Sequence, residues 1–315
     1  MRVIDAPAVS VLMPVYNASR YLKAAMQSVL AQSFKDFEFI IVDDGSSDNS
    51  LEILKEFAKD DSRIKLQTRR NTGIVGALND GLAQAGGEFV ARMDADDVAL
   101  PLRLETQIAA LRSRAECVAM GTAVVFTDPE GRELKVYRPS SIHSEIENEL
   151  AGGNGGALVH PSVMFRRDAL LRCGGYRETY NFIEDLDLYV RLLEFGALSN
   201  LRDVMLHYRQ HGCSVNHTKG NRADQVAEII APLRERMGLP SVTCNTLRDG
   251  CSKVAGGGTC RRLWALAAVE GKNYKTARIN ALLAIIESPL ERLNWSCLRY
   301  VLDVSRRGRM QSAAA

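Results

Sequence analysis

Two stretches near the start of the chain decide the fold, VSVLMPV at residues 9–15 and FEFIIVDDGSS at residues 37–47. Each is a short apolar run followed directly by polar residues, a pattern typical of a strand buried on both faces. Between them, Ser19 can cap a helix that buries Leu22 and Met26 on one face. Strand, helix and strand in this order predict one βαβ unit of a parallel sheet.

The same alternation continues to about residue 126. Further strands are expected at residues 64–68, 88–93 and 117–126, and Asp48 can cap the second of the intervening helices. Strands separated by helices predict an α/β fold, with a central, mostly parallel sheet flanked by helices. Such sheets bind ligands beyond the carboxyl ends of their strands, where this chain places Tyr16, Asp43-Asp44 and Asp94–Asp97.

The second half of the chain is less regular. A glycine-rich loop at residues 152–156 can act as a hinge or lid, a strand is expected at 160–165, and a helix at 184–195. From about residue 220 the pattern is helical, and it becomes basic between Arg299 and Arg309. These helices either pack against the core or dock on an anionic membrane surface.

Composition excludes several classes of protein. The chain has 315 residues, and 40 Lys and Arg against 38 Asp and Glu give a net charge of +2, which excludes a generally basic nucleic-acid binder. A membrane-spanning helix needs about 18 consecutive apolar residues, and no apolar stretch in this chain approaches that length. The seven cysteines include no C-x-x-C pair, so we expect reduced thiols in a cytoplasmic protein.

The motifs point to chemistry on phosphates. No G-x-G-x-x-G follows the first strand, and the chain has no P-loop. Asp94 and Asp96 follow a strand in a turn, where two carboxylates can converge on Mg²⁺ or Mn²⁺ together with substrate phosphates. A solvated acidic turn is the alternative. Asp44 can bind a nucleobase or ribose and Tyr16 can stack on a base, although Asp and Gly also simply turn the chain.

In this order, the motifs resemble those of family 2 glycosyltransferases with the GT-A fold. The resemblance covers roughly residues 9–216, and it is carried by residues 10–17, 41–48, 71–73, 91–97, 182–187 and 208–214. It implies a catalytic domain at 1–219, with a nucleotide-binding part at about 9–125 and an acceptor-side part at 126–219, followed by a helical region at 220–315.

The resemblance also implies an activity and a set of site residues. The activity is a metal-dependent, inverting transfer of one sugar from a nucleotide-sugar, UDP-linked by analogy, to a hydroxyl of a glycan or lipid-linked acceptor in surface polysaccharide synthesis. Asp185 is the implied general base, and His160 and Glu184 lie on the acceptor side. The implied ligands of Mn²⁺ or Mg²⁺ are Asp94, Asp96 and His211. Donor binding falls to Pro14, Val15, Tyr16, Asn17, Asp43, Asp44, Asn71, Gly73, Asn79, Asp94, Ala95 and Arg209.

The chemistry of these residue types agrees with that assignment. Inverting displacement needs one base for the acceptor proton, and Asp185 falls near an expected helix start, where the helix dipole favours an ionised carboxylate. Two alternatives remain, a nucleotidyltransferase of related fold and a non-catalytic nucleotide-sugar-binding partner. A nucleotidyltransferase would need a basic, glycine-rich loop after the first strand, where residues 16–19 instead read YNAS. A non-catalytic partner would be favoured if Asp96 or Asp185 were replaced, but both are present. Processive polysaccharide synthases of the family that this chain resembles carry Gln-x-x-Arg-Trp after the Glu-Asp motif. This chain lacks it, so the resemblance implies a non-processive enzyme, either free in the cytoplasm or peripheral on the cytoplasmic face of the membrane.

Overall fold

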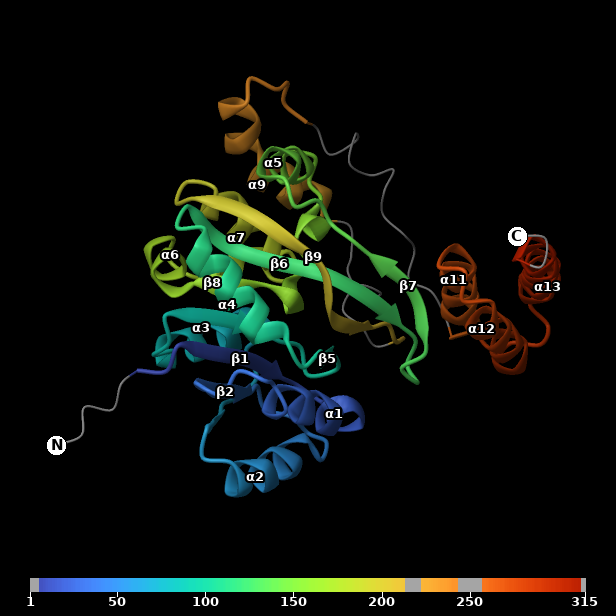
Figure 1. The fold of residues 1–315 in the computed structure, drawn as a ribbon, viewed down its shortest axis with the longest axis horizontal. Coiled ribbons are helices and arrows are strands. Elements are labelled where there is room, and N and C mark those ends of the chain that lie inside the picture. The colour runs from blue at the N-terminus through green and yellow to red at the C-terminus, as the bar shows by residue number, and fades with distance from the viewer. Residues whose placement is uncertain (1–5, 213–221, 243–256, 313–315) are drawn as a thin grey trace. The chain divides into compact units, whose positions relative to one another are not determined.

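The computed structural model describes residues 6–212, 222–242 and 257–312 (Figure 1). The described residues form two compact units. The first unit contains residues 6–124, 138–206 and 222–242, and the second contains residues 125–137, 207–212 and 257–312. The predicted division into a catalytic domain at 1–219 and a helical region at 220–315 stays a prediction.

Within the described residues, nine strands form one sheet in the order β3-β2-β1-β4-β8-β6-β9-β5, with β7 paired to β6. β1, β2, β3 and β4 are parallel, whereas β8 runs antiparallel to both β4 and β6. The predicted α/β class with a mostly parallel sheet is therefore confirmed. The strands are β1 Val9–Val15, β2 Phe37–Asp43, β3 Ile64–Thr68, β4 Phe89–Arg92, β5 Val98–Ala99, β6 Cys117–Thr127, β7 Glu133–Tyr137, β8 Met164–Arg166 and β9 Ala197–Arg209.

Helices cover this sheet in the first unit. Every residue of β1 and β2 is buried, as the short, largely apolar runs predicted, so both faces of these strands are covered. The helices of this unit are α1 Ser19–Leu30, α2 Ser50–Asp60, α3 Ile74–Gln84, α4 Arg103–Ser113, α5 His143–Ala151, α6 Arg167–Arg172, α7 Glu184–Leu192 and α9 Ala223–Arg236. Short 3₁₀ turns lie at η1 Gly155–Ala157, η2 His160–Ser162 and η3 Glu178–Tyr180.

The second unit is a helical one. α11 Gly257–Glu270, α12 Tyr274–Glu287 and α13 Arg292–Ser312 pack on one another and on β7. Its core consists largely of small residues, among them Ala265, Ala268 and Ala277, together with the larger buried side chains of Trp264 and Leu134. None of the helices within 6–212, 222–242 and 257–312 combines the length and apolar character needed to cross a membrane.

Two local predictions were wrong. Ser19 does not cap α1: Ala18 occupies the N-cap position without a side-chain acceptor, and Ser19 is the first helical residue. Asp48 instead accepts the amide of Ser19 (3.0 Å) and the amide of Ser50 (2.9 Å), so one carboxylate serves the first turns of α1 and α2. Residues 160–162 form the turn η2 rather than a strand, because Pro161 has no amide to donate to a sheet.

We expect Asp48→Ala to lower the free energy of unfolding by about 2 kcal/mol, because losing a helix cap costs about 0.5–2 kcal/mol and this carboxylate serves two helices. Asp60→Ala, at the exposed last residue of α2, is the matched control and should change that free energy by less than about 0.5 kcal/mol. Urea unfolding followed by circular dichroism measures both. Equal stability of the two variants would contradict the shared cap.

Candidate active site

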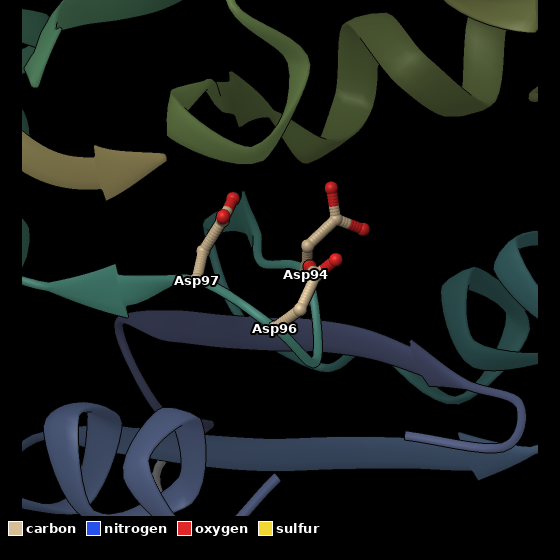
Figure 2. A group of neighbouring side chains, drawn as sticks. All are labelled: Asp94, Asp96 and Asp97. Atoms are coloured by element: carbon tan, nitrogen blue, oxygen red, sulfur yellow. The ribbon is translucent and has the colours of Figure 1, made fainter. Parts of the chain in front are cut away.

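The loop between β4 and β5 gathers three carboxylates. One carboxylate oxygen from each of Asp94, Asp96 and Asp97 lies within 4.8 Å of the other two. Figure 2 shows the three side chains rising from the same side of the loop. Because β4 is parallel to β1, the loop stands at the carboxyl ends of the parallel strands. The structure thus brings together the predicted pair Asp94 and Asp96 and adds Asp97, which the run of acidic residues in the sequence could have indicated.

A buried arginine supports this cluster. The Arg92 guanidinium, at the end of β4, pairs with the carboxylate of Asp94. Burial raises the pKa of Asp94 and the charges of Asp96 and Asp185 raise it further, against the lowering effect of Arg92. The cluster carries several carboxylates, and Arg92 does not fully offset their negative charge. Carboxylate oxygens with an excess of negative charge suit a hard divalent cation. The donor set of Asp94 and Asp96 therefore fits Mg²⁺ or Mn²⁺.

Asp185 lies at the start of α7, where its Oδ1 accepts the amide of Leu186 at 2.8 Å. Its charge contributes to the raised pKa of Asp94, so the two carboxylates are close enough to interact. Gly155 of η1 packs beside it, since a Cβ there would lie 3.6 Å from both carboxylate oxygens. The predicted base and the acidic loop are thus neighbours in the first unit. The hinge or lid role of residues 152–156 stays a prediction.

Glu184, which precedes the predicted base, is buried. Burial alone would lower the pKa of Arg92, but the negative charges around it, chiefly Asp94 with a smaller contribution from Glu184, raise it instead. Arg92 therefore interacts with the acidic loop and with the start of α7. Sequence reasoning missed this arginine, because a charged residue at the end of a strand gives no indication of a partner as far along the chain as Glu184.

We expect Arg92→Met to lower the free energy of unfolding by about 3 kcal/mol, because breaking a buried ion pair leaves a buried carboxylate without its counter-charge. Adding Asp94→Asn to that variant should restore part of the loss, and the double-mutant cycle measures their coupling. Urea unfolding in the presence of EDTA gives all four values. If Arg92→Met is as stable as the parent chain, the pair contributes nothing to folding.

Asp44 has a structural role whatever else it does. Its buried carboxylate accepts the amides of Thr72 (3.1 Å) and Gly73 (2.9 Å), and Arg69 Nε lies 3.3 Å from it. Gly45 beside it has φ +73°, and a Cβ at Gly45 would lie only 2.9 Å from the amide nitrogen of Asn71. Asp44 thus holds the 71–73 turn against the end of β2. Binding of a nucleoside by Asp44, Asn71 and Gly73 stays a prediction.

The loops after β1 and β2 are tied to each other. The Asn17 side-chain oxygen accepts the amide of Ser47 at 2.8 Å, and the Asn17 amide donates to Ser46 Oγ at 3.0 Å. Asp43 Oδ1 accepts the Ser46 amide at 3.3 Å. Tyr16 is 55% exposed at this edge, so its ring is available for stacking. The other predicted contacts here, Pro14 and Val15 of β1 and Ala95 of the acidic loop, are buried.

Asn79 and His160 are engaged with Tyr176. The Asn79 amide donates to the Tyr176 carbonyl (2.8 Å) and accepts its amide (3.0 Å). His160 is buried, with Nε2 3.0 Å from the Tyr176 hydroxyl and its ring edge-on to Tyr189. Both side chains stabilise the interior beside the site. Their predicted roles, donor binding for Asn79 and acceptor contact for His160, stay predictions.

Arg209 and His211 belong to the second unit. Arg209 Nη1 donates to the Pro129 carbonyl at 3.0 Å, and Pro129 belongs to the same unit. Cys213 and Ser214, the last residues of this motif, lie outside the described residues. Diphosphate binding by Arg209 and metal ligation by His211 therefore stay predictions.

Comparison with known proteins defines the family. The family model described as glycosyl transferase family 2 matches residues 10–174. EpsE of Bacillus subtilis (strain 168), a glycosyltransferase by name, is 34% identical over 241 residues, 75% of this chain and 85% of EpsE. The O-antigen biosynthesis glycosyltransferase WbnJ of Escherichia coli is 34% identical over 221 residues, 68% of this chain and 83% of WbnJ. The chain belongs to glycosyl transferase family 2, as its motifs predicted.

Solved structures support the fold. S. aureus TarS 1–349 in complex with UDP-GlcNAc matches with a TM-score of 0.60 at 18% identity, covering 95% of this chain and 92% of TarS 1–349. The mannosyltransferase PcManGT from Pyrobaculum calidifontis, in complex with GDP-Man and Mn²⁺, matches with a TM-score of 0.52 at 16% identity, covering 98% of this chain and 88% of PcManGT. At these identities the likeness establishes the GT-A type of fold.

Proposed function

We propose that this chain transfers one sugar from a nucleotide-diphosphate sugar to an acceptor hydroxyl, with inversion at the anomeric carbon and with the help of a divalent cation. The observation that carries the proposal is the cluster of Asp94, Asp96 and Asp97 at the carboxyl ends of parallel strands, with Asp185 close enough to alter the pKa of Asp94. An acidic cation site and a separate carboxylate are the two groups that a metal-dependent inverting transfer needs.

Each residue would have a distinct task. Asp94 and Asp96 would hold Mn²⁺ or Mg²⁺, and Arg92 would fix the orientation of Asp94 by their ion pair. A bound divalent cation supplies a Lewis acid for the departing diphosphate. Asp185 would accept the acceptor's proton. Because Oδ1 of Asp185 already accepts the Leu186 amide, we assign proton uptake to Oδ2.

The proposed transfer is a single displacement at the anomeric carbon. The acceptor oxygen forms a bond to the anomeric carbon, the bond from that carbon to the diphosphate oxygen breaks, and the nucleoside diphosphate leaves with the electron pair. The acceptor proton moves to Asp185. The side chain of Asp185 is half-buried at the start of α7, and its second carboxylate oxygen, Oδ2, would take up the proton.

The named relatives narrow the substrate proposal. WbnJ acts in O-antigen biosynthesis, TarS was solved with UDP-GlcNAc and PcManGT with GDP-Man and Mn²⁺. We propose a UDP-sugar donor and a glycan or lipid-linked acceptor in surface polysaccharide synthesis. Exposed Tyr16 would stack on the base of the donor.

The test is release of the nucleoside diphosphate from a panel of UDP- and GDP-sugars, each with Mn²⁺, with Mg²⁺ and with EDTA. We expect slow hydrolysis of one UDP-sugar that depends on the cation. Binding of a nucleotide-sugar without any release, with a lipid-linked glycan acceptor also supplied, would favour the non-catalytic binding partner. Release of pyrophosphate from a nucleoside triphosphate and a sugar phosphate would favour the nucleotidyltransferase.

A further inference from the structure

The helices of the second unit leave many large apolar side chains exposed. Of the fifteen such side chains in the described chain, nine lie within residues 257–312, which are 56 of its 284 residues. Scattered apolar residues are ordinary on protein surfaces, whereas a contiguous group marks a site of interaction. The helices concerned are α11, α12 and α13, coloured orange to red in Figure 1.

The most exposed of these side chains lie where α12 passes into α13. Ile286 is 73% exposed, Leu290 95% and Leu293 57%, and we call these three residues the apolar turn. Trp295 belongs to the same place, since its Nε1 donates to the carbonyl of Pro289 at 2.8 Å. The indole ring remains nearly half exposed there. Four large apolar groups therefore stand together at one end of this helical pair.

A stripe of arginine and apolar residues continues from the turn along α13. Arg292, Trp295, Arg299, Leu302 and Arg306 follow one another at intervals of three, four, three and four residues, so they share one side of the helix. All five are exposed. The opposite side, including Cys297 and Val301, is buried in the core of the unit. We call these five residues the arginine stripe.

We propose that the apolar turn and the arginine stripe together dock this chain on the surface of an anionic phospholipid bilayer. Leucine, isoleucine and tryptophan side chains enter the boundary between headgroups and acyl chains, and arginines pair with lipid phosphates. Two copies of this chain would face each other with like-charged stripes, which disfavours self-association through this surface. Docking rests on the second unit alone and does not depend on the proposed sugar transfer.

Co-sedimentation of the full chain with lipid vesicles tests the proposal. We expect the chain to pellet with vesicles of phosphatidylcholine and phosphatidylglycerol in low salt, and to remain in solution with phosphatidylcholine alone or in high salt. Arg299→Gln combined with Arg306→Gln should lower the partition coefficient about 30-fold, because each basic residue near such a surface contributes about a fivefold factor. Leu290→Ser combined with Leu293→Ser should lower it about tenfold or more.

Matched variants in the first unit are the controls. Lys55→Gln with Lys59→Gln removes two exposed charges, and Ile142→Ser with Leu171→Ser removes two exposed apolar groups. Both control variants should pellet with anionic vesicles like the parent chain.

The proposal is overturned if the parent chain stays in solution with anionic vesicles, or if the second-unit variants pellet as the parent chain does. If the parent chain is a dimer that does not bind vesicles, and the second-unit variants are monomers, the surface would instead bind a second copy of this chain. Nucleotide release without vesicles should be equal in all variants, which separates docking from catalysis.

Discussion

Asp96→Ala should weaken UDP binding in the presence of Mn²⁺ by about 100-fold, or about 2.7 kcal/mol at 1.36 kcal/mol per tenfold. The reason is that Asp94 and Asp96 offer the carboxylate oxygens on which the cation and the diphosphate depend. Titration calorimetry with UDP, once with Mn²⁺ and once with EDTA, measures the effect. In EDTA we expect the parent chain and the variant to bind UDP equally weakly.

Asp97→Asn is the informative control for this prediction. Asp97 is buried, and burial lowers the pKa of Arg103 while the charge of Asp97 opposes that shift. Removing the charge of Asp97 should therefore cost stability, with less than about a tenfold loss of cation-dependent affinity. Equal affinity of the parent chain for UDP in Mn²⁺ and in EDTA would refute the cation site itself. A larger loss from Asp97→Asn than from Asp96→Ala would move the ligand assignment to Asp97.

The sequence predicted those features that depend on local pattern. Short, largely apolar runs predicted β1 and β2 as buried strands, and the parallel order then brought their carboxyl ends to one edge of the sheet. Asp94 and Asp96 had to be neighbours, because two residues at i and i+2 in a tight loop cannot lie far apart. Apolar spacing also predicted the helices within α9, α11 and α12.

The structure adds pairings that no local pattern contains. Asp44 holds amides 28 and 29 residues away, and Asn79 bonds with Tyr176, 97 residues away. Such pairs exist because buried polar groups must find partners, and tertiary packing alone decides which partners are within reach. The sequence therefore indicated which polar residues stand at the sheet edge, but not that Asp44 and Asn79 are already engaged there. For the same reason Arg92 could not be connected to Glu184 in advance.

Asp185→Asn should lower the rate of sugar transfer by about 10² to 10⁴-fold, the usual contribution of a general base. That range corresponds to about 2.7–5.5 kcal/mol in the activation free energy. Asparagine keeps the size of the side chain, and its carbonyl oxygen can still accept the Leu186 amide, but it cannot take up the acceptor proton. Affinity for UDP should change little, because the acidic loop after β4 is intact in this variant. Steady-state transfer to the acceptor, or slow hydrolysis of the UDP-sugar, measures the rate.

Glu184→Gln separates the base from its neighbour. Glu184 is buried and its charge acts on Arg92, so this substitution should lower the free energy of unfolding and affect transfer less than Asp185→Asn does. The main effect of Asp185→Asn is thus on the transfer rate, and the main effect of Glu184→Gln is on the free energy of unfolding. A chain that transfers sugar at nearly the parent rate with Asp185→Asn, but not at all with Glu184→Gln, would assign the proton to Glu184 instead. Asp185 is half-buried and Glu184 is buried. We therefore expect Asp185→Asn to cause the larger loss of transfer rate and Glu184→Gln the larger loss of stability.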